Sequence, residues 1–300
     1  MDERKDIRNF FPSVRENVNL AEYTTFKIGG PADYFIEIKN KERLIKVVLW
    51  ARDNNLPFFI LSGGSNLLIS DRGYRGLVIK LGKGEANFRE DKIFCFGGNL
   101  LSEISSLSFK KGLSGLEWSA GIPGSIGGAV FGNAGAFGFS IEDIVLEIEA
   151  LDIQKGEIKK LNNKDCLFGY RSSIFKENNF VILSATLILK KKDRKEIEEK
   201  RNEFLKERKK KQPFGFYSAG SIFKNKKDVS AGSLIDECGL KGKRVGDVVV
   251  SEKHANFISN LGKGKGKEVF KLIRIIKEKV KKRFEIDLEE EIILLGDFMS

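Results

Sequence analysis

The sequence predicts an α+β protein of two or three compact units, the number that 300 residues usually form. Segments with strand and helix patterns alternate over residues 24–112. Residues 119–138 interrupt this alternation, because seven of these 20 residues are glycine. A second series of strand and helix patterns then continues to the C-terminus. The alternating part alone fits an α/β or an α+β module, and we predict α+β for the whole chain.

The N-terminal elements follow from apolar spacing. Leu44, Val47, Val48 and Ala51 recur at i, i+3, i+4 and i+7, which predicts a helix over about 41–55 with one buried face. A second helix is expected over 100–112, where Gly112 would end it. Short apolar runs predict strands at 56–61, 76–81 and 92–96.

The elements after residue 138 follow from the same patterns. Strands are expected at 143–153 and 180–190, and a charged helix over about 193–211 would lead into a further unit. In that unit we expect a short helix near 230–239, a strand at 245–251, a long amphipathic helix at 267–284 and a strand at 291–296.

Composition excludes several classes of protein. The single histidine, His254, rules out a histidine-rich metal site, and we expect no bound metal. Three widely separated cysteines argue for a reducing compartment, because an odd number does not form a disulfide framework. No apolar stretch approaches 18 residues and the charged N-terminus lacks a secretion signal, so we expect no membrane span.

The charge balance indicates an anionic partner. The chain has 53 basic and 42 acidic side chains, a net charge of +11. A nucleic acid, a membrane surface and a phosphorylated small molecule all fit this balance. Basic and acidic residues are mixed in the charged helix, which favours a solvated face over a nucleic-acid arm.

Two glycine-rich segments are the strongest candidates for a binding site. Residues 62–66 (SGGSN) follow a predicted strand, and residues 119–138 form the second segment. Glycine lets successive backbone N–H groups converge on an anion. Packed turns are the alternative reading, but two such segments favour a ligand cradle. Neither GxxxxGK[ST] nor a GxGxxG fingerprint in the right context is present.

Four further positions have residue types suited to chemistry. Arg171 could grip a carboxylate or stabilise an oxyanion, although a surface ion pair is the commoner use of such a residue. Ser221 lies in a small-residue turn that could present its hydroxyl or simply enter a strand. His254 favours a structural role, and residues 289–291 are three adjacent glutamates of which one or two could enter a site.

Taken together, these segments resemble the UDP-N-acetylenolpyruvoylglucosamine reductase family (UDP-N-acetylmuramate dehydrogenase, MurB type). The ordered set of motifs is specific, although no single motif is decisive. The short span between FGYRSSIFK and SAGSIFKN resembles the compact subtype that lacks a tyrosine-bearing loop. The matching segments are TTFKIGGPADYF, LSGGSNLLISD, AGIPGSIGGAVFGNAGAFG, FGYRSSIFK, SAGSIFKN, AGSLIDECGLKG, VSEKHANFI and EEEIILLG.

The resemblance implies a flavoenzyme with three parts. Residues 1–80 and 81–192 would form two subdomains that hold FAD noncovalently in the vanillyl-alcohol-oxidase type of fold. Residues 193–300 would form the C-terminal substrate-binding domain. NADPH would reduce the flavin, whose N5 would then deliver hydride to UDP-N-acetylglucosamine enolpyruvate. The product, UDP-N-acetylmuramate, would serve peptidoglycan synthesis and so cell wall biogenesis, cell shape and cell division.

The resemblance also implies roles for individual residues. Ser221 would protonate the enol-like carbon, while Arg171 and Glu291 would polarise the substrate carboxylate. Glu289 is the rival of Glu291 for this role. Substrate contacts are expected from Tyr170, Lys224 and Asn225. The FAD contacts are expected from Gly63, Gly64, Ser65, Asn66, Leu67, Gly121, Ile122, Pro123, Gly124, Ser125, Gly127, Gly128, Asn133, Ala134 and Gly135.

Two other functions stay open at this point. Another oxidase or dehydrogenase of the same FAD fold is possible, although it would not need the motifs around Arg171 and Ser221. A basic nucleic-acid-binding protein would need aromatic residues interleaved with a basic patch, and no such motif appears. We expect no nucleic-acid partner, a cytoplasmic location and a monomer. Lys226, Tyr217 and Phe216 depart from the family pattern, which leaves the substrate contacts in question.

Overall fold

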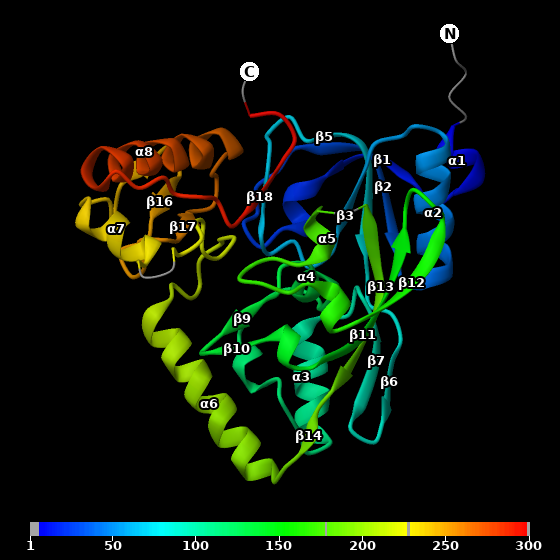
Figure 1. Cartoon of the computed structure of the whole chain (residues 1–300). Helices are drawn as coiled ribbons and strands as arrows, with labels where there is room; N and C mark the ends of the chain where they lie inside the picture. Colours follow the sequence, from blue (N-terminus) through cyan, green and yellow to red (C-terminus); the bar gives the residue numbers. More distant parts are fainter. Residues whose placement is uncertain (1–5, 178, 227–228, 299–300) are drawn as a thin grey trace. The chain divides into compact units, whose positions relative to one another are not determined.

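The computed structural model describes residues 6–177, 179–226 and 229–298 (Figure 1). The chain divides by packing into two compact units, each assembled from three separate stretches of sequence. Unit 1 comprises Met1–Glu16, Tyr34–Gly63 and Gly76–Glu207. Unit 2 comprises Asn17–Asp33, Gly64–Arg75 and Arg208–Ser300.

The first sheet has the strand order β1-β2-β5-β3, and in unit 1 β3 runs parallel to β5 with Phe58 opposite Leu77. The predicted helix α2 buries Leu44, Val47 and Val48, as its spacing requires. Asn40 caps this helix by accepting a hydrogen bond from the Arg43 N–H. The elements are α1 (Ile7–Phe10), β1 (Arg15–Asn19), β2 (Pro31–Ile38), α2 (Lys41–Asp53), β3 (Phe58–Leu61) and β5 (Tyr74–Leu81).

The second sheet of unit 1 is antiparallel, with the order β12-β11-β13-β7-β6. Its apolar face shares a core with α3 and α4, in which Trp118 is almost fully buried. The elements are β6 (Ala86–Arg89), β7 (Lys92–Phe96), α3 (Leu101–Lys110), β8 (Leu113–Ser114), α4 (Ile126–Phe131), β9 (Gly135–Ala136), β10 (Phe139–Ser140), β11 (Val145–Asp152), β12 (Glu157–Asn162), α5 (Ile174–Glu177), β13 (Phe180–Ile188), β14 (Lys190–Lys191) and α6 (Arg194–Lys211).

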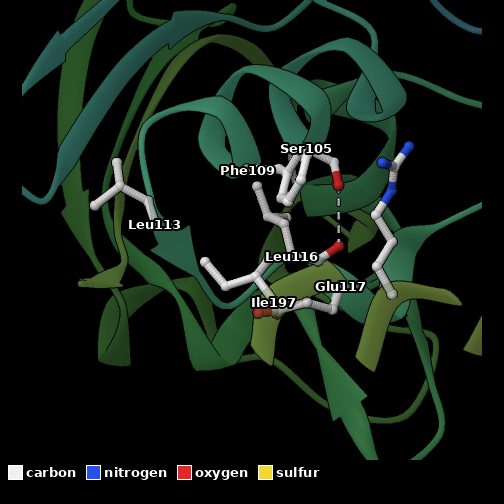
Figure 2. A pocket seen from close by; sticks show the side chains of 7 residues that line it. Ser105, Phe109, Leu113, Leu116, Glu117 and Ile197 are labelled. Atoms are coloured by element: carbon white, nitrogen blue, oxygen red, sulfur yellow. Dashed lines mark hydrogen bonds between the residues drawn. The ribbon is translucent and has the colours of Figure 1, made fainter. Parts of the chain in front are cut away.

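Beside Trp118, unit 1 buries a carboxylate. Glu117 is only 5% exposed and lines a small pocket with Ser105, Phe109 and Arg201 (Figure 2). Its Oε2 accepts a hydrogen bond from the Gly115 N–H at 2.8 Å. Its Oε1 has no hydrogen-bond partner among the described residues. A buried carboxylate oxygen without a partner costs free energy, so this position opposes stability.

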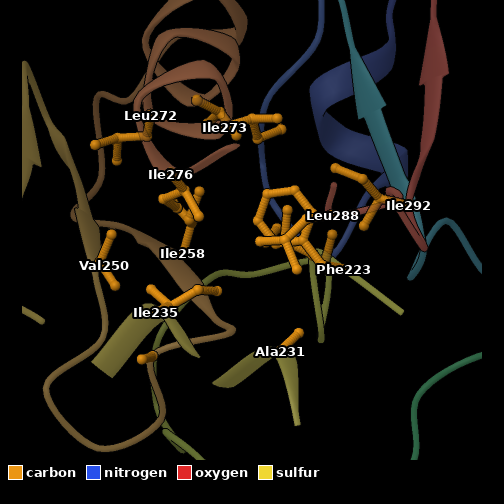
Figure 3. Close-up of a cluster of buried hydrophobic side chains, with 14 of the residues drawn as sticks. Phe223, Ala231, Ile235, Val250, Ile258, Leu272, Ile273, Ile276, Leu288 and Ile292 are labelled. Carbon is orange, nitrogen blue, oxygen red and sulfur yellow. The ribbon is translucent and has the colours of Figure 1, made fainter. Parts of the chain in front are cut away.

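Unit 2 packs α7 and α8 over short strands. The apolar stripe of α8, including Leu272, Ile273 and Ile276, enters one core with Phe223 and Leu288 (Figure 3). The closing strand β18 pairs in parallel with β4. The elements are β4 (Leu67–Ile69), α7 (Ala231–Glu237), β15 (Arg244–Val245), β16 (Val248–Val250), β17 (Ile258–Asn260), α8 (Gly266–Phe284) and β18 (Ile293–Leu295).

Short 3₁₀ helices complete the described secondary structure. They are η1 (Leu20–Tyr23), η2 (Glu117–Ser119), η3 (Ile141–Asp143) and η4 (Lys164–Cys166). The predicted α+β class is confirmed, as are the predicted long helices α2, α3, α6 and α8. Among the described residues no helix is long and apolar enough to cross a membrane. The division at residues 80 and 192 stays a prediction.

Candidate functional site

The predicted site residues fall in both units. Unit 1 contains Gly63, the segment 121–135 and the loop with Tyr170 and Arg171. Unit 2 contains the segment 64–67, the Ser221 turn and the C-terminal glutamates. Each group is built by its own neighbours in the fold.

In unit 1 the two glycine-rich segments meet backbone to backbone. A Cβ placed on Gly63 would lie 2.5 Å from the Gly124 Cα and 3.0 Å from the Ser125 nitrogen. No side chain fits at such a distance, so glycine is required at position 63. The two segments therefore contact each other at Gly63 within this unit, and the prediction that they bind a ligand together stays a prediction.

The helix α4, inside the second segment, was not predicted. Ser125 begins it, and its hydroxyl accepts a hydrogen bond from the Gly128 N–H at 3.1 Å and contacts the Ser62 hydroxyl. The first N–H groups of α4 bond to the backbone beside β7, since Gly127 donates to the Gly97 carbonyl at 2.8 Å. A Cβ on Gly127 would lie 2.9 Å from that carbonyl oxygen. The glycines therefore bring α4 directly against the sheet.

We call the contact region of Gly63 with residues 121–128 the glycine cradle; its uncharged, glycine-rich backbone is of the kind that can bind a dinucleotide diphosphate. Residues 119–138 and 62–63, the part of the two segments that lies in unit 1, contain no charged side chain, so backbone groups and hydroxyls are the groups that unit 1 offers to a ligand. Gly121, Pro123 and Gly128 are exposed at its rim, whereas Ser125 is buried. The residues present could hold FAD, with the buried members shaping the cradle and the rim glycines allowing close approach.

The other half of the first glycine segment belongs to unit 2. Gly64 has a φ of +61°, and a Cβ there would lie 2.0 Å from the Tyr23 carbonyl oxygen. Thr25 joins this turn to the Ser221 motif, because its N–H donates to the Gly64 carbonyl and its hydroxyl to the Ser218 carbonyl at 2.7 Å. The role of Thr25 was not predicted, although it lies in the quoted TTFKIGG motif.

Arg171 lies in a tight loop of unit 1. Gly169 and Ser172 exchange backbone hydrogen bonds of 3.1 Å, which leaves Tyr170 and Arg171 at the tip. Arg171 has a φ of +54°, a strained value for a residue with a side chain. Its Nη2 donates to the Gly135 carbonyl at 3.3 Å, so this loop reaches the end of the glycine segment. Tyr170 is 57% exposed.

Ser221 lies in an extended segment of unit 2, and this segment runs between two other extended segments of the same unit. On one side Ser221 pairs with Phe257 in an isolated antiparallel bridge. On the other side the Glu291 N–H donates to the Ile222 carbonyl at 2.8 Å. The Asn66 amide donates to the Glu291 carbonyl at 3.0 Å. The structure therefore brings Ser221, Glu291 and Asn66 into one layer, although they are far apart in sequence.

The three adjacent glutamates have different partners. Glu289 is 69% exposed in its side chain and pairs with Lys224. Glu290 pairs with Lys277 of α8 at 2.8 Å. Glu291 is half-buried and follows the residue that bridges to Phe223. Glu289 and Glu290 thus form ion pairs within unit 2, and the choice of Glu291 over Glu289 as the catalytic carboxylate stays a prediction.

Asn225 caps the start of α7 rather than pointing freely from its turn. Its Oδ1 accepts a hydrogen bond from the Ala231 N–H at 3.0 Å. The neighbouring Lys226 N–H donates to the Val229 carbonyl at 3.1 Å. The predicted substrate residues Lys224 and Asn225 are thus held by local contacts within unit 2.

His254 bonds to the backbone of Asn256, whose side chain in turn binds Phe223, two residues after Ser221. Its Nδ1 accepts a hydrogen bond from the Asn256 N–H at 3.3 Å. Burial, together with the nearby Lys241 charge, lowers the pKa of His254. The buried Asn256 binds both backbone groups of Phe223, at 2.9 and 2.8 Å, and was missed although it lies in the quoted HANF motif. This geometry agrees with the structural role favoured for His254.

The three cysteines lie apart from one another as free thiols. Cys95 and Cys166 are buried, and burial raises their pKa values to about 12 and about 11. Cys238 is half-buried, and all three are free thiols. Among the described residues no group of three His, Cys, Asp or Glu could hold a metal ion.

Comparisons with known proteins match both parts of the chain. The model of the "FAD binding domain" family matches residues 32–162. The model of the "UDP-N-acetylenolpyruvoylglucosamine reductase, C-terminal domain" family matches residues 212–295. The chain thus resembles one family in its N-terminal part and another in its C-terminal part.

Individual relatives match nearly the whole chain. The UDP-N-acetylenolpyruvoylglucosamine reductase of Clostridium tetani is 41% identical over 286 residues, covering 95% of this chain and 93% of that protein. The Clostridium novyi protein of the same name is 39% identical and covers 95% and 92%. The crystal structure of the reductase from Thermus caldophilus has a TM-score of 0.82 and 36% identity, covering 94% and 100%.

Proposed function

Because the chain belongs to the UDP-N-acetylenolpyruvoylglucosamine reductase family, we propose that it reduces UDP-N-acetylglucosamine enolpyruvate to UDP-N-acetylmuramate. It is an oxidoreductase with an FAD-binding domain and a member of a family that acts in peptidoglycan synthesis. The use of NADPH as reductant, the cytoplasmic location, the monomeric state and the compact subtype rest on the sequence resemblance and form part of the proposal.

The observation that supports this reaction most is the layer formed by the Ser221 segment and the C-terminal glutamates. The backbone hydrogen bond from the Glu291 N–H to the Ile222 carbonyl, at 2.8 Å, makes the segment that contains Ser221 and the segment that contains Glu291 neighbours. A hydroxyl can deliver a proton only where a neighbouring group lowers the cost of the charge that develops. A carboxylate and a serine in one layer suit the protonation of an enol-like carbon.

The reduction also needs a source of hydride, and we assign its binding to the glycine cradle of unit 1. FAD bound there would provide the hydride that the reduction needs. Gly63 and Gly127 let backbone segments approach within distances that no Cβ allows. The rim residue Gly121 is exposed, which lets a diphosphate approach its backbone, whereas the Gly128 N–H is already bonded to the Ser125 hydroxyl.

Arg171 has the role of stabilising negative charge. Its guanidinium offers several donors in one plane, which suits a carboxylate or an enolate oxygen better than a lysine would. The loop from Gly169 to Ser172 holds this residue at the end of the glycine segment. The exposed Tyr170 beside it would contact the sugar or the nicotinamide.

Measurement of the two half-reactions in Ser221→Ala tests the proposal. Reduction of the flavin by NADPH should proceed as in the wild type, since no proton from Ser221 is needed. Reoxidation by the enolpyruvyl sugar should slow by about 10²–10⁴-fold, the usual contribution of a positioned general acid. The exposed Ser233 of α7 offers a matched control, and Ser233→Ala should change neither rate.

The outcomes separate the role of Ser221 from the activity itself. Equal slowing of both half-reactions would show that Ser221 is not the proton donor. A wild-type flavoprotein that NADPH reduces but the sugar does not reoxidise would exclude the proposed substrate and favour another dehydrogenase of the same fold.

A further inference from the structure

The Arg171 loop of unit 1 cannot hold its conformation by itself. Its tip residue has a φ of +54°, which costs a residue with a side chain of the order of 1 kcal/mol or more. The loop has one pair of backbone hydrogen bonds, between Gly169 and Ser172. Surrounding groups must therefore impose the conformation, and the structure identifies two of them.

Asn133 fixes the loop at its first residue. The Asn133 Nδ2 donates to the Gly169 carbonyl at 2.9 Å and to the Glu142 carboxylate at 2.8 Å. Asn133 is 4% exposed and has a φ of +42°, which asparagine tolerates better than most residues. Both amide hydrogens are used within the protein, and the side chain joins the end of the glycine segment to the arginine loop.

Lys176 fixes the loop at its tip. The Lys176 Nζ donates to the Arg171 carbonyl at 2.7 Å and lies 5.7 Å from the centre of the Phe131 ring. A cation bound to this carbonyl holds the peptide unit that follows the strained φ. Ser173, which is 1% exposed, adds a bond from its hydroxyl to the Phe131 carbonyl at 2.7 Å.

We propose that Asn133 and Lys176 are positioning residues that hold the strained Arg171 loop in the geometry needed for reduction of the enolpyruvyl sugar. The inference rests on the proposed function, because it takes Arg171 as the group that stabilises the substrate carboxylate. Asn133 acts through the loop and not by contact with the reacting atoms. A displacement of about 1 Å in such a group can cost about 10²-fold in rate.

Asn133→Asp in the complete flavoprotein tests the first clamp. Aspartate has the same shape and accepts a positive φ, but an ionised aspartate cannot donate to the Gly169 carbonyl and is repelled by the Glu142 carboxylate, so the loop loses this clamp. In protein saturated with FAD, reoxidation by the enolpyruvyl sugar should slow by about 10–100-fold more than flavin reduction by NADPH does. Lys176→Met removes the second clamp, the bond to the Arg171 carbonyl, while leaving the hydrogen bonds of Asn133 in place, and it should slow the same step.

Asn163→Asp is the matched control. The Asn163 amide also donates two hydrogen bonds in unit 1, to the Glu142 and Val145 carbonyls, and neither bond goes to residues 169–172. It should lower thermal stability, because aspartate cannot donate to these two carbonyls, while the sugar half-reaction keeps its wild-type rate. Slowing in this control as well would show that lost stability, and not the position of Arg171, causes the effect.

A double-mutant cycle with Arg171→Lys provides a readout that a merely structural role would not change. If Asn133 acts through Arg171, Asn133→Asp should have little further effect on the sugar half-reaction once Arg171 is replaced. Additive effects would overturn the inference, as would wild-type rates in both Asn133→Asp and Lys176→Met. Failure of Arg171→Lys to slow the sugar half-reaction would instead contradict the proposed function of Arg171.

Discussion

The contact between Gly63 and Gly124 allows a quantitative prediction for Gly63→Ala. The added Cβ would lie 2.5 Å from the Gly124 Cα and 2.9 Å from its carbonyl carbon. These atoms are backbone, so relief requires the two glycine segments to move apart. Overpacking of this kind costs about 1–3 kcal/mol, and the upper end applies because no flexible side chain can give way. A loss of about 3 kcal/mol should lower the Tm of a unit of this size by about 6–12 °C.

Thermal unfolding of the FAD-free protein, followed by FAD titration, checks both consequences. Gly63→Ala should unfold at lower temperature and bind FAD more weakly, because the cradle that Gly63 and Gly124 form is widened. Gly132→Ala is the control, since the nearest atom to its Cβ would be 3.6 Å away. A Gly63→Ala protein with wild-type Tm and FAD affinity would refute the reasoning that close backbone approach builds the cradle.

Three further predictions concern charged groups. Glu291→Gln should slow the sugar half-reaction by about 10²-fold or more, whereas Glu289→Gln, which removes an exposed ion pair, should keep its rate constant. Because the pKa of His254 is lowered in the fold, the unfolded chain binds more protons below about pH 6.5. Unfolding stability should therefore fall from pH 7 to pH 5, and less so in His254→Gln. Glu117→Gln keeps the acceptor for the Gly115 N–H and removes a buried charge, so urea unfolding should show about 1 kcal/mol more stability.

Each of these predictions has a result that would contradict it. Equal rate losses in the two glutamate variants would leave Glu291 without a distinct role. A pH dependence identical in His254→Gln and the wild type would mean that other groups set it. Destabilisation by Glu117→Gln would show that the buried carboxylate is stabilised by its surroundings, with Arg201 at the same pocket the first group to test.

The sequence was most informative where one periodicity runs long enough to be distinctive. The stripe of Val269, Leu272, Ile273 and Ile276 predicted α8 and its buried face, and the structure places all four in the core of unit 2. In contrast, β6 and β12 were not predicted. They are edge strands with mostly polar or half-exposed side chains, so alternation is weak.

The division into units lay beyond sequence patterns. Residues 17–33 and 64–75 pack with the C-terminal part, and the parallel pairing of Leu67 with Ile293 joins segments more than 200 residues apart. Nothing local encodes such a pairing, because each strand is only three residues long. Resemblance to a family could indicate the motifs, but only the folded structure shows which motifs belong to the same unit.

The candidate site shows the same division between what local pattern reveals and what packing decides. Two glycine-rich runs predicted a cradle, and Gly63 does lie against Gly124. Glycine composition concealed the helix α4, whose only local signal is the capping Ser125. Asn133 was predicted as a cofactor contact from its place in the segment, and this stays a prediction. Its side-chain bonds to Gly169 and Glu142 depend on segments that only the fold brings together.

The visible absorption spectrum of the purified protein, recorded anaerobically before and after NADPH and then after UDP-N-acetylglucosamine enolpyruvate, tests the central claim most directly. We expect flavin bands that NADPH bleaches and that the enolpyruvyl sugar restores. A folded protein that stays colourless and takes up no added FAD would contradict the account, and so would a reduced flavin that the sugar fails to reoxidise.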